Sequence, residues 1–424
     1  MKYAITMLLA GCTVAAVFIS CGSARAAPYT LEIVAQAGDI IDGRLITGFS
    51  SEVIRVGISD DREVAFFAFA ASAEGTGLSL MTQRRFIAGA GKVVDGWVPQ
   101  FGSEPSLAIN GLGDVAYKAT IPNVARGVFL NQKLLLMDGD EIDGREISAV
   151  QDSPDINDAG TVVVLARPGP VKLSINGPSE LMVEHGTMVD GFTVDSFSNP
   201  RINNAGDVIF YGALEELPRA DFSVLSTDRV ILKLGDVIED VTITFIRSHG
   251  INESGEVFVK MDGTDINGER NDYIATENRI VYGPDHIVPG ATDPVIAGHS
   301  VVVNSDGRFA FLGAVEAPGR SGGFKSGFRG FLVVSDAILI SEGDIFEDKV
   351  VSAVYPNFDM NEHGDIAFRV VFEDGSQAVV LATPTIPEPS SLVLAAMGVV
   401  FLLTRRSIQS PVRECTTRNE EVMR

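Results

Sequence analysis

The sequence predicts an all-β fold: a seven-bladed β-propeller of four-stranded blades, closed by pairing the N-terminal strand with the last blade. Three observations lead to this prediction. A nine-residue frame, INNAGDVIF at 202–210, recurs until the chain holds seven copies. The copies are 46 to 57 residues apart, which is the length of a propeller blade. The 43 Gly and 19 Pro among 424 residues are too many turn formers for a helical protein.

The repeated frame joins a turn to a strand, because N-x-x-G is followed by alternating apolar residues. The other copies are INGLGDVAY (109–117), INDAGTVVV (156–164), INESGEVFV (251–259), VNSDGRFAF (303–311), MNEHGDIAF (360–368) and the worn ISDDREVAF (58–66). Asn can hydrogen-bond its own turn, and Gly can adopt the positive φ that the turn needs. We therefore predict structural turn roles, with a ring of ligand-binding amides as the alternative, for Asn110, Gly113, Asn157, Gly160, Asn203, Gly206, Asn252, Gly255, Asn304, Gly307, Asn361 and Gly364.

A second motif alternates with the first. Its copies are AGDIIDGRLI (37–46), DGDEIDGREI (138–147), HGTMVDGFTV (185–194), LGDVIEDVTI (234–243) and EGDIFEDKVV (342–351), with degenerate forms at 89–97 and 283–290. Four short strands fit in each unit, for example Ser106–Asn110, Val115–Ile121, Gly127–Leu130 and Lys133–Met137. The repeated acidic pairs of this motif, such as Asp39 and Asp42, are expected to form turns, with a shared carboxylate site as the alternative.

The order of the two motifs predicts how the ring closes. The chain begins with the second motif and ends with the first, so the last unit lacks its fourth strand. The strand Leu31–Ala37 can supply it beside Ala378–Ala382, and closure would remove exposed sheet edges. We therefore place the propeller at residues 28–383. An open solenoid has the same period but gains nothing from this order.

The N-terminus predicts export. Residues 1–26 form a signal peptide, in which Lys2 precedes an apolar run that ends at Ala24-Arg25-Ala26. Leu9-Ala10-Gly11-Cys12 has the form of a lipoprotein box and is the alternative. After cleavage at Ala26 the propeller holds no cysteine, so disulfides cannot stabilise it.

The C-terminus predicts sorting at a membrane. Residues 384–406 contain Pro387, Glu388 and Pro389, an apolar run too short for a comfortable bilayer span, and the basic pair Arg405 and Arg406. This order resembles the PEP-CTERM segment of exported bacterial proteins. The resemblance implies cleavage by an exosortase-like enzyme after transient membrane anchoring. A polar tail, 407–424, follows the basic pair and departs from the family pattern.

The repeat also resembles the tandem NxxGxxAF family of secreted proteins over most of residues 31–382, with position 62, an Arg, as a departure. The resemblance supports the architecture and implies no activity.

Composition and motifs limit the partners and cofactors. The formal charge of −23 argues against nucleic acid as a partner. No cofactor is indicated, and the five histidines have no zinc spacing. Calcium is the one metal candidate, through the clustered oxygens of Asp262, Asp265, Asn267 and Glu269.

The loop at 317–330 contains two motif matches that we do not assign to chemistry. Gly319-Arg320-Ser321-Gly322-Gly323 fits G-x-S-x-G, and GRSGGFKS approaches a P-loop, but a strand follows where each motif needs a helix. Arg320, Lys325 and Arg329 form a local cationic spot.

These observations indicate an exported, non-catalytic binding or structural protein of the cell envelope or extracellular matrix. Extracellular polysaccharide or another surface protein is the expected partner. The alternative is a propeller-fold hydrolase or lyase acting on extracellular polysaccharide. Such an enzyme would gather residues that break the repeat symmetry, such as His249, Asp262 or Arg320, in one pocket on the axis.

The sorting hypothesis predicts that the mature native protein ends near Pro389, because the short apolar run is a poor permanent anchor. Mass spectrometry of surface-associated and released material should recover peptides from 31–382 and lack those from 407–424. Recovery of the tail from most of the mature protein would contradict the hypothesis.

Overall fold

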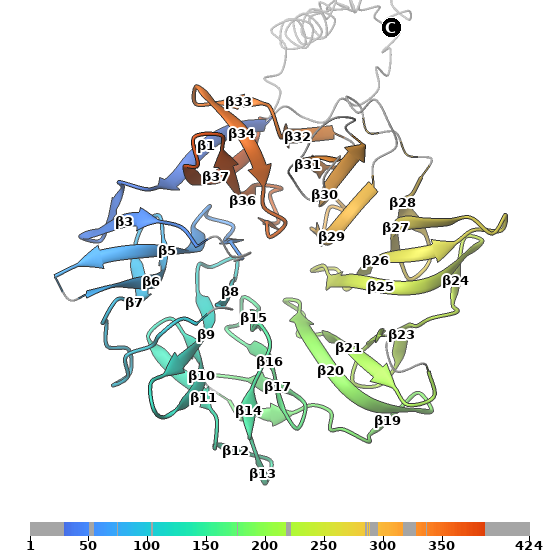
Figure 1. Ribbon diagram of the computed structural model, residues 1–424. Helices are drawn as coiled ribbons and strands as arrows, with labels where there is room; N and C mark the ends of the chain where they lie inside the picture. The colour runs from blue at the N-terminus through green and yellow to red at the C-terminus, as the bar shows by residue number, and fades with distance from the viewer. Residues whose placement is uncertain are drawn as a thin grey trace, which may run out of the picture. The chain divides into compact units, whose positions relative to one another are not determined.

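The computed structural model describes residues 29–385, apart from 51–54, 74, 103–104, 176, 218–221, 285, 287, 289–295, 317–327 and 336. The expected signal peptide, the sorting segment with Pro387, Glu388, Pro389, Arg405 and Arg406, and the polar tail lie outside the described residues. The described residues form seven antiparallel blades around a central axis, as the sequence predicted (Figure 1). None of them forms a helix long and apolar enough to cross a membrane.

The first three blades follow one another along the chain. Blade 1 contains β2 (Ile40–Ile41), β3 (Arg44–Gly48), β4 (Gly57–Ile58), β5 (Val64–Ser72), β6 (Gly75–Thr82) and β7 (Phe86–Gly89). Blade 2 contains β8 (Ser106–Ile109), β9 (Val115–Ile121), β10 (Ala125–Leu130) and β11 (Lys133–Met137), close to the four predicted strands. A hairpin of β12 (Glu141–Ile142) and β13 (Arg145–Glu146) leads to blade 3, which contains β14 (Ala149–Val150), β15 (Asp155–Ile156), β16 (Val162–Arg167), β17 (Pro170–Leu173) and β18 (Glu180–Leu181).

The remaining blades repeat the pattern. Blade 4 contains β19 (Met188–Val189), β20 (Phe192–Ile202), β21 (Val208–Leu214), β22 (Phe222–Leu225) and β23 (Val230–Leu232). Blade 5 contains β24 (Val237–Ile238), β25 (Val241–Ile251), β26 (Val257–Thr264), β27 (Arg270–Thr276) and β28 (Ile280–Tyr282). Blade 6 contains β29 (Ile296–Val303), β30 (Phe309–Glu316), β31 (Phe328–Val334) and β32 (Ala337–Ser341).

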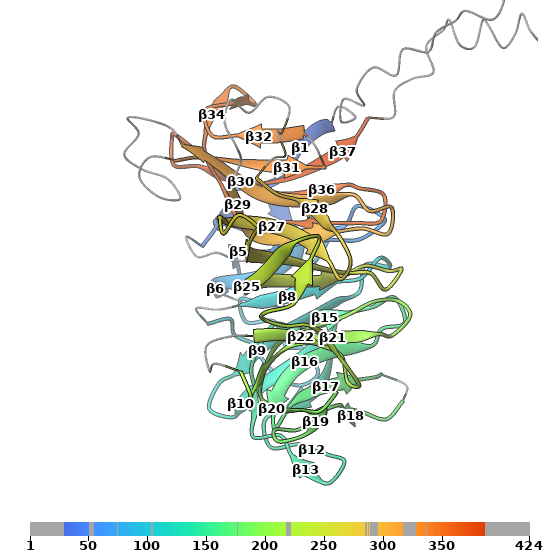
Figure 2. The same ribbon diagram turned by 90° about the vertical axis from the view of Figure 1, so that its right-hand side faces the viewer.

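Blade 7 closes the ring. It contains β33 (Ile345–Phe346), β34 (Lys349–Val354), β35 (Asp359–Met360), β36 (Ile366–Phe372), β37 (Gln377–Pro384) and, as its outer strand, β1 (Tyr29–Gln36). β1 pairs antiparallel with β37, from Tyr29 opposite Pro384 to Gln36 opposite Ala378. The two strands lie side by side in both views (Figures 1 and 2). The predicted closure by the N-terminal strand is therefore confirmed.

The core is divided among the gaps between blades. Seven apolar clusters of the described residues each join two neighbouring blades. One of them joins blade 1 to blade 7 through contacts among Ile46, Phe66, Ala367 and Val379. Because a four-stranded sheet has two apolar faces, each blade is stable only between two neighbours.

The repeated Asn carries hydrogen bonds in two directions. Its Oδ1 accepts the backbone N–H four residues later, as Asn157 does from Thr161 at 3.0 Å. Its Nδ2 donates to a backbone carbonyl of the next blade. The donor and acceptor pairs are Asn110 with Asn157, Asn157 with Asn203, Asn203 with Asn252, Asn252 with Asn304, Asn304 with Glu362, and Asn361 with Ser59.

The degenerate copy at 58–66 lacks the side-chain amide bond to the next blade. The Ser59 hydroxyl accepts a hydrogen bond from the N–H of Glu63 at 2.9 Å and so keeps the turn. Serine has no side-chain amide, so it cannot donate the N–H bond that Asn donates to the next blade. Arg62 stands where the other copies have Gly, and it adopts φ 62°. The corresponding glycines have φ between 72° and 88°, a region that is costly for other residues.

The two roles of the repeated Asn can be separated by mutation. We expect Asn157→Ser to keep the turn, as Ser59 does, and to lose the bond to the next blade, at a cost of about 1–2 kcal/mol in the free energy of unfolding. Asn157→Ala loses both interactions and should cost more. Equal stability of the serine variant and the wild type in denaturant titrations would show that the inter-blade amide bond does not stabilise the ring.

Candidate functional site

The innermost strands line a cavity of about 300 Å³ on the propeller axis. Side chains alternate along a strand, so every second residue before the repeated Asn faces the axis. The residue directly before the Asn is apolar, and Ile58 and Ile156, for example, pack between blades and also border the cavity. The residue two before the Asn lines the cavity, and it differs from blade to blade: Gly57, Ala108, Asp155, Arg201, Gly250, Val302 and Asp359.

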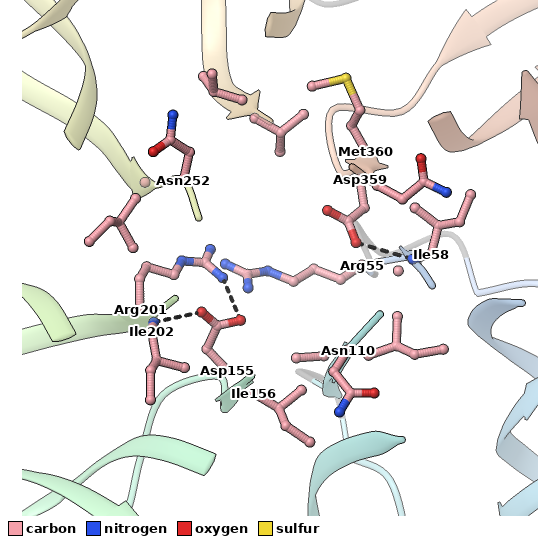
Figure 3. Close-up of a pocket in the computed structure, with 18 of the residues that line it drawn as sticks. Arg55, Ile58, Asn110, Asp155, Ile156, Arg201, Ile202, Asn252, Asp359 and Met360 are labelled. Carbon is pink, nitrogen blue, oxygen red and sulfur yellow. Dashed lines mark hydrogen bonds and ion pairs between the residues drawn. The ribbon is translucent and has the colours of Figure 1, made fainter. Parts of the chain in front are cut away.

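Two arginines point toward each other across this cavity (Figure 3). Arg201 comes from the end of β20, and Arg55 precedes β4. The charge of Arg201, together with burial, lowers the pKa of Arg55 to about 9. Arg55 donates to Oδ1 of Asn199 at 3.4 Å, and Arg201 lies 3.7 Å from Oδ1 of Asp155. The cavity therefore holds two like charges close together with only partial compensation.

Asp359 supplies the second carboxylate of the cavity wall. Its Oδ2 accepts the N–H of Ile58 at 3.1 Å, which links blade 7 to blade 1 (Figure 3). Burial raises the pKa of Asp359 to about 6, and the charge of Asp155 adds to the rise. Backbone hydrogen bonds and Arg201 act in the opposite direction. This carboxyl group therefore changes its charge near neutral pH.

The mouth of the cavity is acidic. Four acidic residues line the cavity directly after the repeat position, which is the repeated Asn or, in blade 1, Ser59. They are Asp60, Asp158, Glu253 and Glu362. Each accepts a backbone N–H from the preceding blade, for example Gly111 to Asp158 at 2.8 Å. Burial raises the pKa of Glu253, and the neighbouring carboxylates at 362, 158 and 155 add to the rise. The mouth therefore repels ligands that carry many negative charges.

The wall between blades 4 and 5 contains an unusual polar group. His249, only 3% exposed, lines the cavity at a position occupied by Val56 and Val301 in other blades. Its ring centroid lies 4.0 Å from that of Tyr211. Burial lowers the pKa of His249 to about 3, Arg201 acts in the same direction, and the backbone of Asn199 opposes them. His249 is therefore neutral at physiological pH.

The other residues expected to break the symmetry do not join His249. The Asp262 carboxylate binds Arg247 at 2.6 and 2.7 Å and Arg270 at 2.9 Å, and it lies 3.8 Å from Nζ of Lys260. It therefore belongs to an ion-pair network in blade 5 and not to the cavity lining. Arg320 and the other motif matches at 319–325 lie outside the described residues.

The calcium candidates are engaged in other interactions. Oδ1 of Asp265 accepts the backbone N–H groups of Asn267 at 2.9 Å and Glu269 at 2.8 Å, as in a turn. The Asp262 carboxylate is paired with Arg247 and Arg270. Among the residues that the structure describes, no group of three or more His, Cys, Asp or Glu is arranged to hold a metal ion.

The carboxylates of the second motif also bind backbone groups. Asp39 and Asp140 accept the N–H three residues earlier, at 2.8 and 2.7 Å. Asp42 accepts the N–H of Phe86 at 3.4 Å, and Asp143 accepts that of Leu181 at 2.9 Å. Phe86 and Leu181 lie on outer strands, so these side chains cover sheet edges.

Sequence reasoning missed Arg55, Asp155, Arg201 and Asp359. A signal was present, because Asp155, Arg201 and Asp359 stand two residues before the repeat position, on the axial side of their strands. Arg55 stands two residues earlier still in its repeat, just before β4. Comparing these positions across the seven copies would have found the charges.

Comparisons with known proteins found one matching family model and several similar solved structures. Residues 15–222 match a family of unknown function, DUF7453. No curated protein matches the chain. Similar solved structures include the polysaccharide lyase Uly1, with 7% identity, a TM-score of 0.41 and coverage of 84% of this chain and 99% of that one. They also include the Dos1 propeller, with 11% identity, a TM-score of 0.38 and coverage of 84% and 95%. A gluconolactonase from Xanthomonas campestris has 9% identity, a TM-score of 0.31 and coverage of 68% and 94%.

The raised pKa of Asp359 predicts a pH-dependent effect of Asp359→Asn. A carboxyl group whose folded pKa is raised destabilises the fold as pH rises from its unfolded pKa, near 4, through about 6. The substitution should therefore increase the free energy of unfolding by about 1–2 kcal/mol more at pH 7.5 than at pH 4.5, after allowance for screening by water in the cavity.

Asp374→Asn is the matched control. Hydrogen bonds from Ser376 lower the pKa of Asp374, so this group titrates below the tested range and its substitution should have the same effect at both pH values. An Asp359→Asn effect that is equally independent of pH would contradict the assignment.

Proposed function

We propose that this protein is an exported, non-catalytic binding protein of the cell envelope or extracellular matrix, and that its axial cavity binds a carboxylate-bearing glycan. The observation that carries the proposal is the pair of facing guanidinium groups of Arg55 and Arg201 (Figure 3). Each of the seven blades contributes to the cavity, yet among the described residues that line it the cationic side chains come from only two blades.

An anion between the two arginines would relieve their repulsion. The pKa of Arg55 is lowered chiefly by Arg201, which means that the positive charge of one makes the other less favourable. A bound carboxylate would favour the charged form of both arginines. A guanidinium can also donate two parallel hydrogen bonds to a carboxylate. Asp155 and Asp359 limit the positive potential, so a singly charged group is a better match than a phosphate.

The size and charge of the cavity select among glycans. A volume of about 300 Å³ is at the lower end of small-molecule sites and suits about one sugar ring. The acidic mouth and the net charge of −23 disfavour a densely charged polymer. A glycan with isolated uronic acid residues meets both constraints, because it presents one carboxylate among neutral sugars.

The expected signal peptide and PEP-CTERM-like segment support the extracellular part of the proposal. Propellers bind ligands at the axis through side chains from several blades, without any need for catalytic groups. The enzymatic alternative is tested in the same experiment, because a lyase or hydrolase would shorten the glycan that it binds.

The proposal predicts that binding requires both the glycan carboxylate and the arginine pair. Purified protein should bind an acidic heteropolysaccharide with isolated uronates and should not bind its carboxyl-reduced form. Arg55→Gln and Arg201→Gln should each weaken binding by about tenfold or more, the loss expected for a charge-assisted hydrogen bond. Arg145→Gln is the control, because Arg145 is exposed on the β12–β13 hairpin and pairs with Glu184 away from the axis.

Calorimetry on the wild type and the three variants measures these affinities, and thermal melting checks that each variant is folded. Equal binding of the native and carboxyl-reduced polymers, or unchanged binding by both axial variants, would refute the proposal. Shortening of the polymer during incubation would replace the non-catalytic function with the enzymatic one.

A further inference from the structure

The wall between blades 4 and 5 contains buried polar atoms for which the described residues supply no hydrogen-bond partner. They are the Tyr211 and Ser248 hydroxyls, and the His249 imidazole beside them has the backbone of Asn199 as a polar neighbour. Ser248 and His249 line the axial cavity. Tyr211 is 8% exposed and packs against the His249 ring. Buried polar groups in native proteins are nearly always satisfied, so this concentration needs an explanation.

The repeat shows that the fold does not require a polar side chain at the position of His249. The position of His249 is held by Val56 in blade 1, Leu107 in blade 2 and Val301 in blade 6, and all of them are buried. The position of Tyr211, eight residues after the repeat position, varies more widely, from Phe67 and Leu312 to Lys118 and Lys260. Apolar residues therefore fill the position of His249 in other blades, at no cost of unpaired polar atoms.

These polar groups lie beside the cationic part of the cavity. Burial raises the pKa of Tyr211 and lowers that of His249, and the positive charge of Arg201 opposes the first shift and adds to the second. The imidazole is held neutral by burial, so it offers one donor and one acceptor, and the two hydroxyls can each donate and accept. Neutral groups that both donate and accept suit sugar hydroxyls and do not suit a second anion.

We infer that Tyr211, Ser248 and His249 form a subsite that binds the ring hydroxyls of a single uronic acid residue, whose carboxylate lies between Arg201 and Arg55. This inference rests on the proposed function and adds the specificity of the same cavity. The ligand is then the terminal uronic acid of a glycan, because one sugar ring fills the cavity and the acidic mouth accepts only neutral sugars behind it.

Two small probes separate the subsite from the arginine pair. Glucuronic acid carries the carboxylate and the ring hydroxyls, whereas tetrahydropyran-2-carboxylic acid has the same ring and carboxylate without hydroxyls. The wild type should prefer glucuronic acid by about tenfold or more. Arg201→Gln should weaken the binding of both probes and leave their ratio nearly unchanged.

Variants of the subsite should instead reduce the ratio of the affinity for glucuronic acid to that for tetrahydropyran-2-carboxylic acid. Tyr211→Phe, Ser248→Ala and His249→Val should each lower the preference for glucuronic acid by about five- to tenfold and change the affinity for the hydroxyl-free probe little. His249→Val restores the residue found at positions 56 and 301. Because the first two variants remove hydroxyls without partners and the third restores an apolar residue, they should melt at the same temperature as the wild type or higher.

The outcomes distinguish the two proposals. If neither probe binds, or Arg201→Gln has no effect, the proposed function fails. If the arginine dependence holds and the three subsite variants retain the wild-type preference, only the inferred subsite is wrong. A variant that melts well below the wild type would show that the polar group serves the fold, which also contradicts the inference. Titration with the acidic heteropolysaccharide then tests whether its chain end competes with free glucuronic acid.

Discussion

The structure depends on a ring of side-chain amides. Each repeated Asn closes its own turn through Oδ1 and reaches the next blade through Nδ2. The side chains are almost fully buried, from 1% to 5% exposed, so water cannot replace these bonds. A residue with one short polar branch and both donor and acceptor capacity is needed, which explains why the same letter recurs in six of the seven copies.

This constraint fixes some positions and leaves others free to vary. The residue before the Asn must pack between blades, and the Gly after it must adopt positive φ. The residues two and four before the Asn face the axis and range from Gly and Val to Asp and Arg, although Asp155 and Asp359 also accept backbone N–H groups of the next blade. Differences among blades can therefore accumulate there without weakening the ring, and that is where Arg55 and Arg201 stand. The same separation between scaffold and cavity explains how a symmetric fold can hold an asymmetric site.

Carboxylates serve the scaffold in three places. In the second motif they cap turns and cover outer strand edges, at the cavity mouth they hold the backbone of the preceding blade, and in the cavity Asp359 joins blade 7 to blade 1. Many of the acidic residues behind the charge of −23 thus satisfy backbone N–H groups that the sheets leave unpaired. Their negative field is a consequence of this role, and it also limits which ligands can approach the axis.

The sequence by itself determined the all-β class, the number of blades and the closure of the ring. Turn residues and strand alternation are local signals, and their spacing and order along the chain allow few topologies. The N-x-x-G turns could be predicted because Asn and Gly have distinctive backbone preferences. The inter-blade half of the Asn bonds could not, because it joins residues 46 to 58 positions apart, and 302 positions apart where the ring closes.

Only the tertiary structure decided which side chains meet on the axis. Arg55, Asp155, Arg201 and Asp359 lie in four different blades, and none forms a motif with its sequence neighbours. Of the three candidates that broke the repeat, His249 reaches the cavity, Asp262 is held in an ion-pair network, and Arg320 lies outside the described residues. The physical reason is that a charge at one strand position faces the axis and at the next faces a neighbouring blade, so ring closure and strand register decide its partners.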